Sequence, residues 1–254
     1  MSRYVITGLG LICAAGNDVP TCWDNIRKGV SGIREVESVS TEGCVSHVGA
    51  EVHCDTLPAP QYDRSVRLCL KAAQEAVQDS KLPQSDLHDA GVVLGSCVGG
   101  AASIDHYYSG LLRGEEHKAD ILKMSASSIA CDVAHELGAS GETANIVNAC
   151  AAGTMSVAYA CDLIRAGKGK VYLAGGTDAF SSLAYSGFNA LHALSAEACS
   201  PLNHSNGITL GEGSGVVVVE EYEHAVARGA KIYCEVAGYG VSSDAFHITA
   251  PQPE

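Results

Sequence analysis

Residues 145–154 read Asn-Ile-Val-Asn-Ala-Cys-Ala-Ala-Gly-Thr, and here a short β-type segment gives way to a small and apolar run from Ala151 to Ala166. This change predicts a strand followed directly by a helix, with Cys150 at the junction. The first helical turn carries partnerless N–H groups and a partial positive charge, which favour a thiolate and can hold an oxyanion. Cys150 is therefore a candidate nucleophile. A small buried core thiol is an equally good interpretation from the residues alone, because the chain has eleven cysteines.

The same alternation of patterns extends through the chain. Segments typical of strands are 3–7, 90–95, 145–148, 171–174, 216–220 and 232–241. Segments typical of helices are 19–28, 63–80, 103–113, 127–137, 151–166 and 221–228, whereas residues 30–62 are irregular. Strands that alternate with helices predict an α/β domain whose largely parallel sheet is covered on both faces.

Composition narrows the class of protein. The 254 residues are 46% hydrophobic, and no apolar run is long enough to cross a bilayer, so we expect no membrane association. The cysteine count is odd, no Cys-x-x-Cys pair occurs and the first residues lack a signal sequence, which predicts a reduced, cytoplasmic protein. The formal charge of −13 argues against nucleic acid as a partner.

One segment departs from the acidic average. On a helix over residues 63–80, Arg64, Arg67 and Lys71 share one face. The opposite face is apolar and carries Val66, Leu70, Ala73 and Val77. From the residues alone, an ordinary solvated face is a better interpretation than a docking patch.

Two further motifs indicate a binding site only weakly. Gly8 and Gly10 follow a strand, as in dinucleotide-binding loops, but Cys13 occupies the place of the third glycine and no acidic residue follows at the required distance. Four possible metal ligands occur close together at Cys44, His47, His53 and Cys54, with a spacing that does not match zinc sites. We therefore expect neither a nucleotide nor a metal at these places.

Several motifs occur in a characteristic order. They are residues 148–153 (Asn-Ala-Cys-Ala-Ala-Gly), 175–178 (Gly-Gly-Thr-Asp), 187–195 (Gly-Phe-Asn-Ala-Leu-His-Ala-Leu-Ser), 210–216 (Leu-Gly-Glu-Gly-Ser-Gly-Val) and 242–247 (Ser-Ser-Asp-Ala-Phe-His). With them the chain resembles the β-ketoacyl-acyl carrier protein synthases, the elongating condensing enzymes of fatty acid and polyketide synthesis. The resemblance extends from Arg3 to the end. It implies a thiolase-like fold with layered α/β/α structure, built from two halves.

The resemblance also implies an acyltransferase mechanism. Cys150 would take an acyl group as a thioester from the phosphopantetheine arm of an acyl carrier protein. A malonyl group on a second carrier would then lose CO2 and attack that thioester. No bound cofactor or metal is implied. Such enzymes form homodimers through the strand that precedes the nucleophile, here residues 145–148.

Other site residues follow from the same resemblance. Val98 and Phe188 match positions at the acyl pocket and its gate. Asp244, His247 and Thr249 match positions near the entrance for the pantetheine arm. Arg64, Arg67 and Lys71 match the helix that docks the carrier protein, which turns the interpretation of that basic face towards function.

The chain also departs from the family pattern. Complete members carry two catalytic histidines, one in a His-Gly-Thr motif, and no His-Gly-Thr occurs here. We therefore expect residues 1–254 to form the amino-terminal half, with the first strand of the second half at about 231–254 and no carboxy-terminal half. Such a chain would accept an acyl group but would lack the histidines for the full condensation. The loop over residues 201–207 is also altered, which leaves its role in the site wall open.

Two other hypotheses remain beside the condensing enzyme. The first is a noncatalytic partner subunit of thiolase fold, and the presence of Cys150 speaks against it because such partners usually lack the cysteine. The second is a starter-unit or chalcone-type acyltransferase, which typically has other residues around the cysteine and no Leu-Gly-Glu-Gly-Ser-Gly segment.

Overall fold

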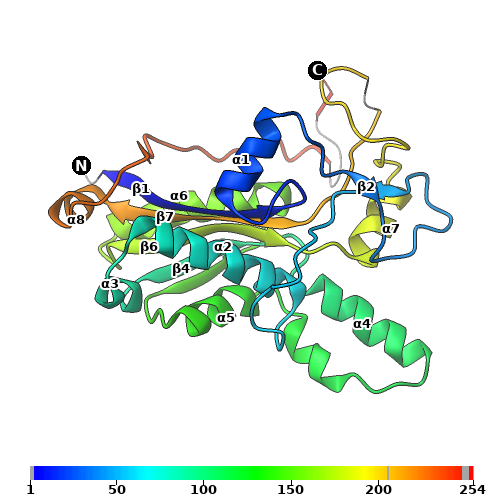
Figure 1. Ribbon diagram of the computed structural model, residues 1–254, viewed down its shortest axis with the longest axis horizontal. Coiled ribbons are helices and arrows are strands. Elements are labelled where there is room, and N and C mark those ends of the chain that lie inside the picture. The colour runs from blue at the N-terminus through cyan, green and yellow to red at the C-terminus, as the bar shows by residue number, and fades with distance from the viewer. Residues whose placement is uncertain (1–2, 205, 248–251, 254) are drawn as a thin grey trace.

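The computed structural model describes residues 3–204, 206–247 and 252–253, and a six-stranded sheet lies at the centre of this part of the chain (Figure 1). Its strands follow the order β5-β4-β6-β7-β1-β8. Their bounds are β1 (Tyr4–Cys13), β4 (Gly91–Gly95), β5 (Thr143–Ile146), β6 (Val171–Asp178), β7 (Gly213–Glu221) and β8 (Cys234–Glu235). A separate ribbon pairs β2 (Arg34–Glu35) with β3 (Val48–Gly49).

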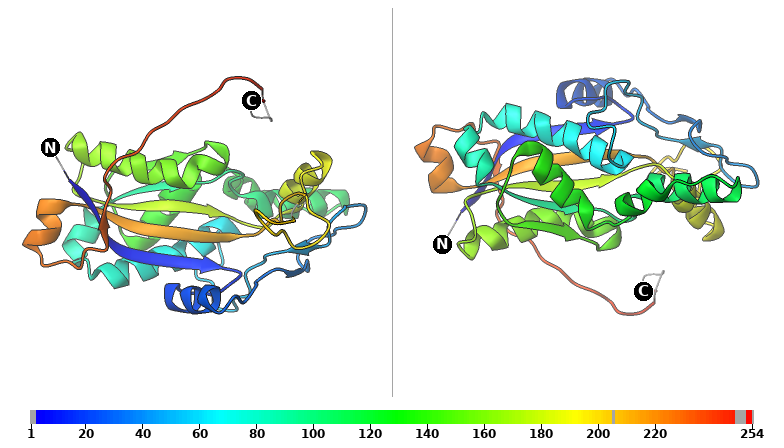
Figure 2. Two further views of the ribbon diagram at one scale, coloured as in Figure 1. Left: turned by 90° about the horizontal axis from the view of Figure 1, so that it is seen from above. Right: turned by 90° about the horizontal axis from the view of Figure 1, so that it is seen from below.

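Helices cover both faces of the sheet. Helices α2 (Arg64–Ser80) and α5 (Ser128–Leu137) pack on one face, and α6 (Ala152–Arg165) packs on the other (Figure 2). The remaining helical elements lie around this centre and are α1 (Val19–Arg27), α3 (Gln84–His88), α4 (Ala101–Leu112), α7 (Ser182–Ala190), α8 (Tyr222–Ala227) and the 3₁₀ turns η1 (Lys118–Lys123) and η2 (Ala149–Ala151). The predicted α/β/α layering is confirmed.

Strand β4 shows why the sheet needs cover on both sides. Because side chains alternate along a strand, Val92 and Leu94 face the core under α2 and α5, whereas Val93 faces the core under α6. All three are fully buried. A central strand that is apolar on both faces can be stable only between two layers of helices.

The prediction of a largely parallel sheet is wrong. Strand β4 pairs in parallel with β5 and β6, but the pairs β6–β7, β7–β1 and β1–β8 are antiparallel. The connection from Asp178 to Gly213 explains the difference, because these two residues are partners in the register and the chain between them stays at one end of the sheet. Antiparallel neighbours need no crossover helix along the sheet face.

Several element boundaries also differ from the sequence prediction. Strand β1 does not stop at residue 7 but continues through Gly8 and Gly10, where α2 crosses it. A Cβ atom on Gly10 would lie 1.8 Å from the carbonyl oxygen of Ala72, so this glycine allows a close helix–strand approach and forms no phosphate-binding loop. The strand predicted at 232–241 is limited to β8, and helices α3 and α7 were not predicted.

A buried carboxylate ties α8 to the sheet. Glu220, fully buried, accepts hydrogen bonds from Thr7 Oγ1 at 2.8 Å, from Arg228 Nε at 2.7 Å and from His224 Nδ1 at 2.6 Å. Burial raises the pKa of Glu220, but the hydrogen bonds from Arg228, His224 and Thr7 outweigh this and bring the pKa below its usual value. The native structure therefore holds Glu220 as a carboxylate.

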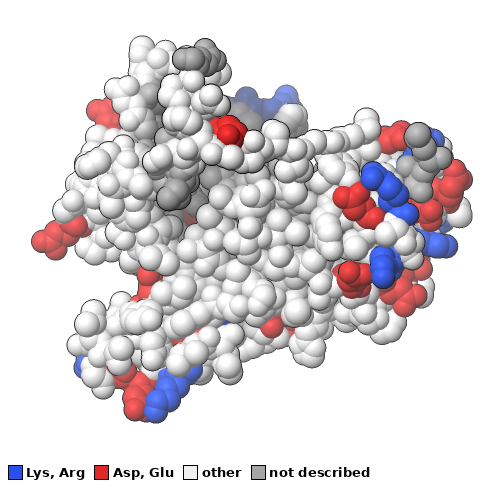
Figure 3. Space-filling model, turned by 180° about the vertical axis from the view of Figure 1, so that it is seen from behind, with Lys and Arg blue, Asp and Glu red and all other residues white. Residues whose placement is uncertain are grey.

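The last described segment leaves the sheet after β8. The hydroxyl of Tyr239 donates to Asp162 of α6, and the chain then runs outward past this helix (Figure 2). Figure 3 shows the molecule from behind. The broad middle of this side has almost no charged side chains, and most of the charged side chains lie near its ends. No helix in the described part of the chain has the length and apolar character needed to span a membrane.

Candidate active site

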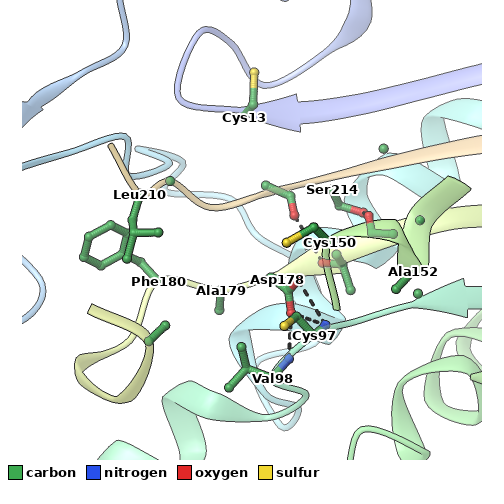
Figure 4. Close-up of a pocket in the computed structure, with 18 of the residues that line it drawn as sticks. Cys13, Cys97, Val98, Cys150, Ala152, Asp178, Ala179, Phe180, Leu210 and Ser214 are labelled. Atoms are coloured by element: carbon green, nitrogen blue, oxygen red, sulfur yellow. Dashed lines mark hydrogen bonds between the residues drawn. The ribbon is translucent and has the colours of Figure 1, made fainter. Parts of the chain in front are cut away.

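A pocket of about 520 Å³ opens at one end of the sheet. Strands β1, β4 and β6 end there and β7 begins there, so the sheet topology brings residues from distant parts of the sequence to one place. Its lining is mainly apolar and includes Cys97, Val98, Cys150, Asp178, Phe180 and Phe188 (Figure 4). Cys150, Val98 and Phe188, which the sequence predicted as site residues, are thus together.

Cys150 lies in the 3₁₀ turn η2, directly before α6. It is exposed and lines the pocket. The preceding residue, Ala149, has a φ of 43°, a left-handed conformation that is uncommon for a residue with a side chain and often occurs at functional sites. The predicted junction of strand, cysteine and helix is confirmed, although the strand ends at Ile146 and not at residue 148.

Glycines allow the start of α6 to approach the sheet. A Cβ atom on Gly95 would lie 2.3 Å from the carbonyl carbon of Ala152, and one on Gly176 would lie 3.1 Å from the Cα of Gly153. The ends of β4 and β6 therefore contact the backbone of the first turn of α6 directly. This contact fixes the height of Cys150 above the sheet.

Asp178 fixes the opposite wall of the pocket. Its carboxylate accepts hydrogen bonds from Ser96 Oγ at 2.8 Å and from the backbone N–H groups of Cys97 and Val98 at 3.0 and 3.2 Å (Figure 4). The loop that carries Val98 is thus held by the end of β6. Asp178 closes the Gly-Gly-Thr-Asp motif, but its role was not predicted from the sequence.

Glu212 organises the loops beside the pocket. This buried carboxylate accepts from Arg64 Nε at 2.7 Å and from the backbone N–H groups of Val52 and Phe180 at 2.8 and 3.0 Å. Its position between Gly211 and Gly213 in the Leu-Gly-Glu-Gly motif was the only feature of the sequence that could have indicated this role. Glu212 therefore positions Phe180, which lines the pocket.

The prediction that Arg64 belongs to an open basic face of α2 is wrong. Its guanidinium forms an ion pair with Glu212, and the side chain is 32% exposed. Hydrogen bonds to Glu212 raise the pKa of Arg64. Its charge is therefore neutralised inside the protein, because the carboxylate that attracts it comes from a segment 148 residues away in the sequence.

The other two basic residues of α2 keep access to solvent. Arg67 is half-buried and donates to the backbone carbonyls of Pro58 and Leu57. Because these carbonyls are neutral, the contacts do not neutralise the charge of Arg67. Lys71 is half-buried at a shallow depression that Asp18 and Glu75 also line. The predicted amphipathic helix is confirmed, but its basic face is limited to these two residues.

Two of the three predicted entrance residues lie in the described part of the chain, and they do not line the pocket. Asp244 and His247 are exposed on the segment that follows β8, and neither lines the pocket. Hydrogen bonds from the N–H groups of Phe246 and Gln252 lower the pKa of Asp244. Thr249 lies outside the described residues.

The four residues considered as metal ligands do not form a group of metal-binding side chains in the described structure. His47 Nδ1 instead forms a hydrogen bond with the hydroxyl of Thr41 at 2.9 Å.

We expect limiting iodoacetamide to modify Cys150 before the other cysteines. Burial raises the pKa of Cys22 and Cys69 to about 12 and that of Cys161 to about 11, and it also raises the pKa of Cys97. Only a thiolate reacts well, and Cys150 is exposed at a helix N-terminus. Peptide mapping after partial labelling measures the order, and modification of Cys97 or Cys161 with Cys150 intact would contradict it.

Comparison with known proteins shows the family of the chain that carries this site. Residues 1–225 match the family model of the β-ketoacyl synthase N-terminal domain. The chain belongs to the β-ketoacyl synthase family. It is 37% identical over 271 residues to 3-oxoacyl-[acyl-carrier-protein] synthase 2 of Staphylococcus aureus (strain N315), a match that covers 99% of the chain and 66% of that protein. It is also 35% identical over 267 residues to Nodulation protein E of Rhizobium sp. (strain N33), again covering 99% of the chain and 66% of the relative.

Solved structures of β-ketoacyl synthases support the same family assignment. The ishigamide ketosynthase/chain length factor superposes with a TM-score of 0.92 at 33% identity, over 98% of this chain and 66% of that one. A type II ketosynthase solved in complex with its acyl-carrier protein and bound to the hexaketide gives a TM-score of 0.86 at 32% identity, over 97% of this chain and 64% of that one. The thiolase-like fold expected from the sequence is confirmed. The chain spans slightly less than two thirds of the length of these relatives.

Proposed function

We propose that this β-ketoacyl synthase chain carries the acyl-accepting part of a decarboxylative condensing enzyme of fatty acid or polyketide synthesis, with Cys150 as the nucleophile. One observation carries the proposal: Cys150 is exposed in an apolar pocket at the N-terminus of α6, together with Val98 and Phe188. An apolar wall suits an acyl chain, and a thiolate at its edge suits attack on a thioester carbonyl. These features also support an active chain over a noncatalytic partner subunit.

The acyl transfer requires one bond to form and one to break. The Cys150 thiolate adds to the carbonyl carbon of an acyl thioester on a carrier's phosphopantetheine arm. The bond from that carbon to the pantetheine sulfur then breaks, and the pantetheine thiolate leaves and takes a proton from solvent. The N-terminus of α6 stabilises the oxyanion that forms during the attack, because this negative charge lies beside the positive end of a helix.

The second step transfers the acyl group from Cys150 to a new carbon. A malonyl thioester on a carrier loses CO2, and the resulting carbanion attacks the thioester carbonyl and releases the Cys150 thiolate. Histidine, lysine and arginine are absent from the described lining of the pocket. We therefore assign residues 1–254 to the amino-terminal domain, which supplies the nucleophile and the acyl pocket, and we assign the polarisation of the malonyl carbonyl to groups outside this lining.

We propose an acyl carrier protein as the partner and the α2 face around Arg67 and Lys71 as the place where it docks. The chain has a net charge of −13, so an acidic carrier needs a local basic surface. The related ketosynthase solved with its acyl-carrier protein supports this type of partner. No cofactor is needed beyond the pantetheine arm that brings the substrate. The eleven free cysteines support a reducing, cytoplasmic location.

Mass spectrometry of the chain after incubation with an acyl carrier protein tests this function. We expect the mass of one acyl group on the peptide that contains Cys150, and its absence would contradict the proposal. A Lys71→Glu variant should load several-fold more slowly from the carrier because its charge repels an acidic surface. A short acyl thioester without the carrier serves as the control, since the variant should react with it at the rate of the original chain.

We also propose a homodimer that forms through β5. This strand is at the edge of the sheet and pairs only with β4 among the described strands. Both polar side-chain atoms of Asn145 on β5 are buried without a hydrogen-bond partner in the described structure, and Val147 just beyond the strand is 63% exposed. A second copy paired along this edge would complete the sheet across the interface.

The dimer has a direct measurement. Light scattering at micromolar concentration should give twice the mass of the chain. The carbonyl of Ile146 accepts from Ser96 beside β4, so the neighbouring residue Asn145 directs its N–H to the open edge. Asn145→Pro removes that donor and should reduce the mass to that of the monomer. Circular dichroism of the variant serves as the folding control. A folded original chain of monomer mass would contradict the homodimer.

A further inference from the structure

A cluster of two histidines and one aspartate lies apart from the pocket, where helix α4 meets the turn η1. His106 belongs to α4, His117 caps η1 and Asp120 lies within η1. One possible ligand atom from each of the three residues lies within 4.8 Å of the other two. Neither the family assignment nor the proposed acyl transfer uses these residues.

The three side chains are held against one another. His106 Nδ1 contacts Asp120 Oδ2 at 2.6 Å, and the imidazole rings of His106 and His117 have centroids 4.2 Å apart. Gly110 makes room for this arrangement, because a Cβ atom there would lie 2.1 Å from Cδ2 of His117. The fold therefore places the His117 ring directly on α4, one turn from His106.

We propose that His106, His117 and Asp120 bind a divalent transition-metal ion of the zinc class. Two imidazoles and one carboxylate are ligands that zinc and its neighbours in the first transition row prefer. Metal–ligand bonds of about 2.0 to 2.2 Å place tetrahedral donor atoms about 3.4 Å apart, so the present cluster needs only small side-chain rotations to close around an ion. Glu115 contacts His117 Nε2 at 3.0 Å but is not part of this group, so a water molecule would complete the coordination.

One lysine lies beside the cluster. Lys123 Nζ is 3.3 Å from Asp120 Oδ1, whereas Asp120 Oδ2 faces His106. The ammonium group repels a metal cation at this carboxylate, which sets a clear expectation for a Lys123 variant. Entry is open, because His106 and Arg113 also line a surface pocket of about 740 Å³.

The ion would join two elements that contact each other beside the acyl pocket. Helix α4 starts at Ala101, three residues after Val98, and η1 returns the chain to Met124, whose carbonyl accepts from the N–H of Gly100. A bound metal would restrict motion of the whole segment between these points. We expect hydrogen exchange of residues 115–123 to slow when the metal binds.

Cobalt titration of the reduced chain tests the site. Bound Co²⁺ should show visible d–d bands without the near-ultraviolet charge-transfer band of a thiolate ligand, and added Zn²⁺ should remove them. His106→Ala and His117→Ala should each weaken binding by about 100-fold or more, since loss of an outer-sphere partner alone costs up to that much. His135→Ala, an exposed histidine on α5, is the matched control and should leave binding unchanged.

A gain of affinity separates this proposal from loss of folding. Lys123→Gln removes the positive charge beside Asp120 and should tighten Co²⁺ binding by at least about 2- to 5-fold, the range for a solvent-exposed pair, because this pair is partly buried. Absence of binding in the original chain would overturn the proposal. Binding that shows a thiolate band and survives His106→Ala and His117→Ala would also overturn it, because the ion would then be held by cysteines.

Discussion

Replacement of Cys150 by alanine should abolish transfer of an acyl group from the carrier to the protein. The variant keeps the pocket and α6 but has no atom that can form the thioester. Loss of a nucleophile in other enzymes lowers the rate by about 10⁶-fold, which is below detection for most acyl-transfer assays. The measurement is the rate of appearance of acyl-protein by intact-mass spectrometry, compared at equal concentration with the original chain.

Cys97 is the right control for this experiment. It lines the same pocket and belongs to the loop that Asp178 holds. Burial, the Asp178 carboxylate and the nearby Cys150 raise its pKa, so it reacts more slowly as a nucleophile. Cys97→Ser should therefore load at a rate close to that of the original chain. Loading of the Cys150→Ala variant, or loss of loading in Cys97→Ser with the fold intact, would show that the nucleophile is Cys97.

Replacement of Arg228 by alanine should lower the free energy of unfolding by about 3 to 5 kcal/mol, because it leaves the charge of the fully buried Glu220 without its strongest partner. Urea denaturation followed by circular dichroism at neutral pH measures the change. An effect below 1 kcal/mol, roughly that of an exposed ion pair, would contradict the interpretation of this cluster.

The same cluster predicts the direction of a pH effect. The pKa of Glu220 is lowered from 4.5 in the folded protein, so its carboxylate contributes stability that is fully present above the unfolded value. That contribution is lost as the pH falls below 4.5 and through the lower folded value. Glu220→Gln removes the titrating group, and its free energy of unfolding should fall less steeply with acid than that of the original chain.

Local patterns predicted the elements of the fold better than their arrangement. The amphipathic helix capped by Asp63 and the buried strand over residues 90–95 carry their signals in adjacent residues, and both are present. Strand direction depends on the path of long connections, which periodicity does not encode, and for this reason the parallel sheet was predicted wrongly. Strand β1 was predicted too short because its glycines indicate a loop unless a helix packs against them.

The site residues also differ in this respect: some could be predicted from adjacent residues, and others depend on distant segments of the chain. The position of Cys150 at a junction of strand and helix is a local property and was predicted from the sequence. Asp178 and Glu212 act through hydrogen bonds to segments about 80 and 150 residues away, so only the fold reveals what they hold. Arg64 was assigned to a solvent face for the same reason, since nothing near it in the sequence indicates its buried partner.

The glycine contacts between the sheet and α6 make the position of the Cys150 thiol independent of the size of the pocket. These two properties could otherwise constrain each other. Gly95 and Gly176 let the backbone of the first turn of α6 lie directly on the ends of β4 and β6, so no side chain at these two positions sets the height of the thiol. Val98, Phe180 and Phe188 can therefore vary in bulk, and the range of acyl chains can diverge between descendants, without displacement of the reacting sulfur. Under the proposed function, the range of substrates can thus evolve in small steps while the position of the nucleophile remains unchanged.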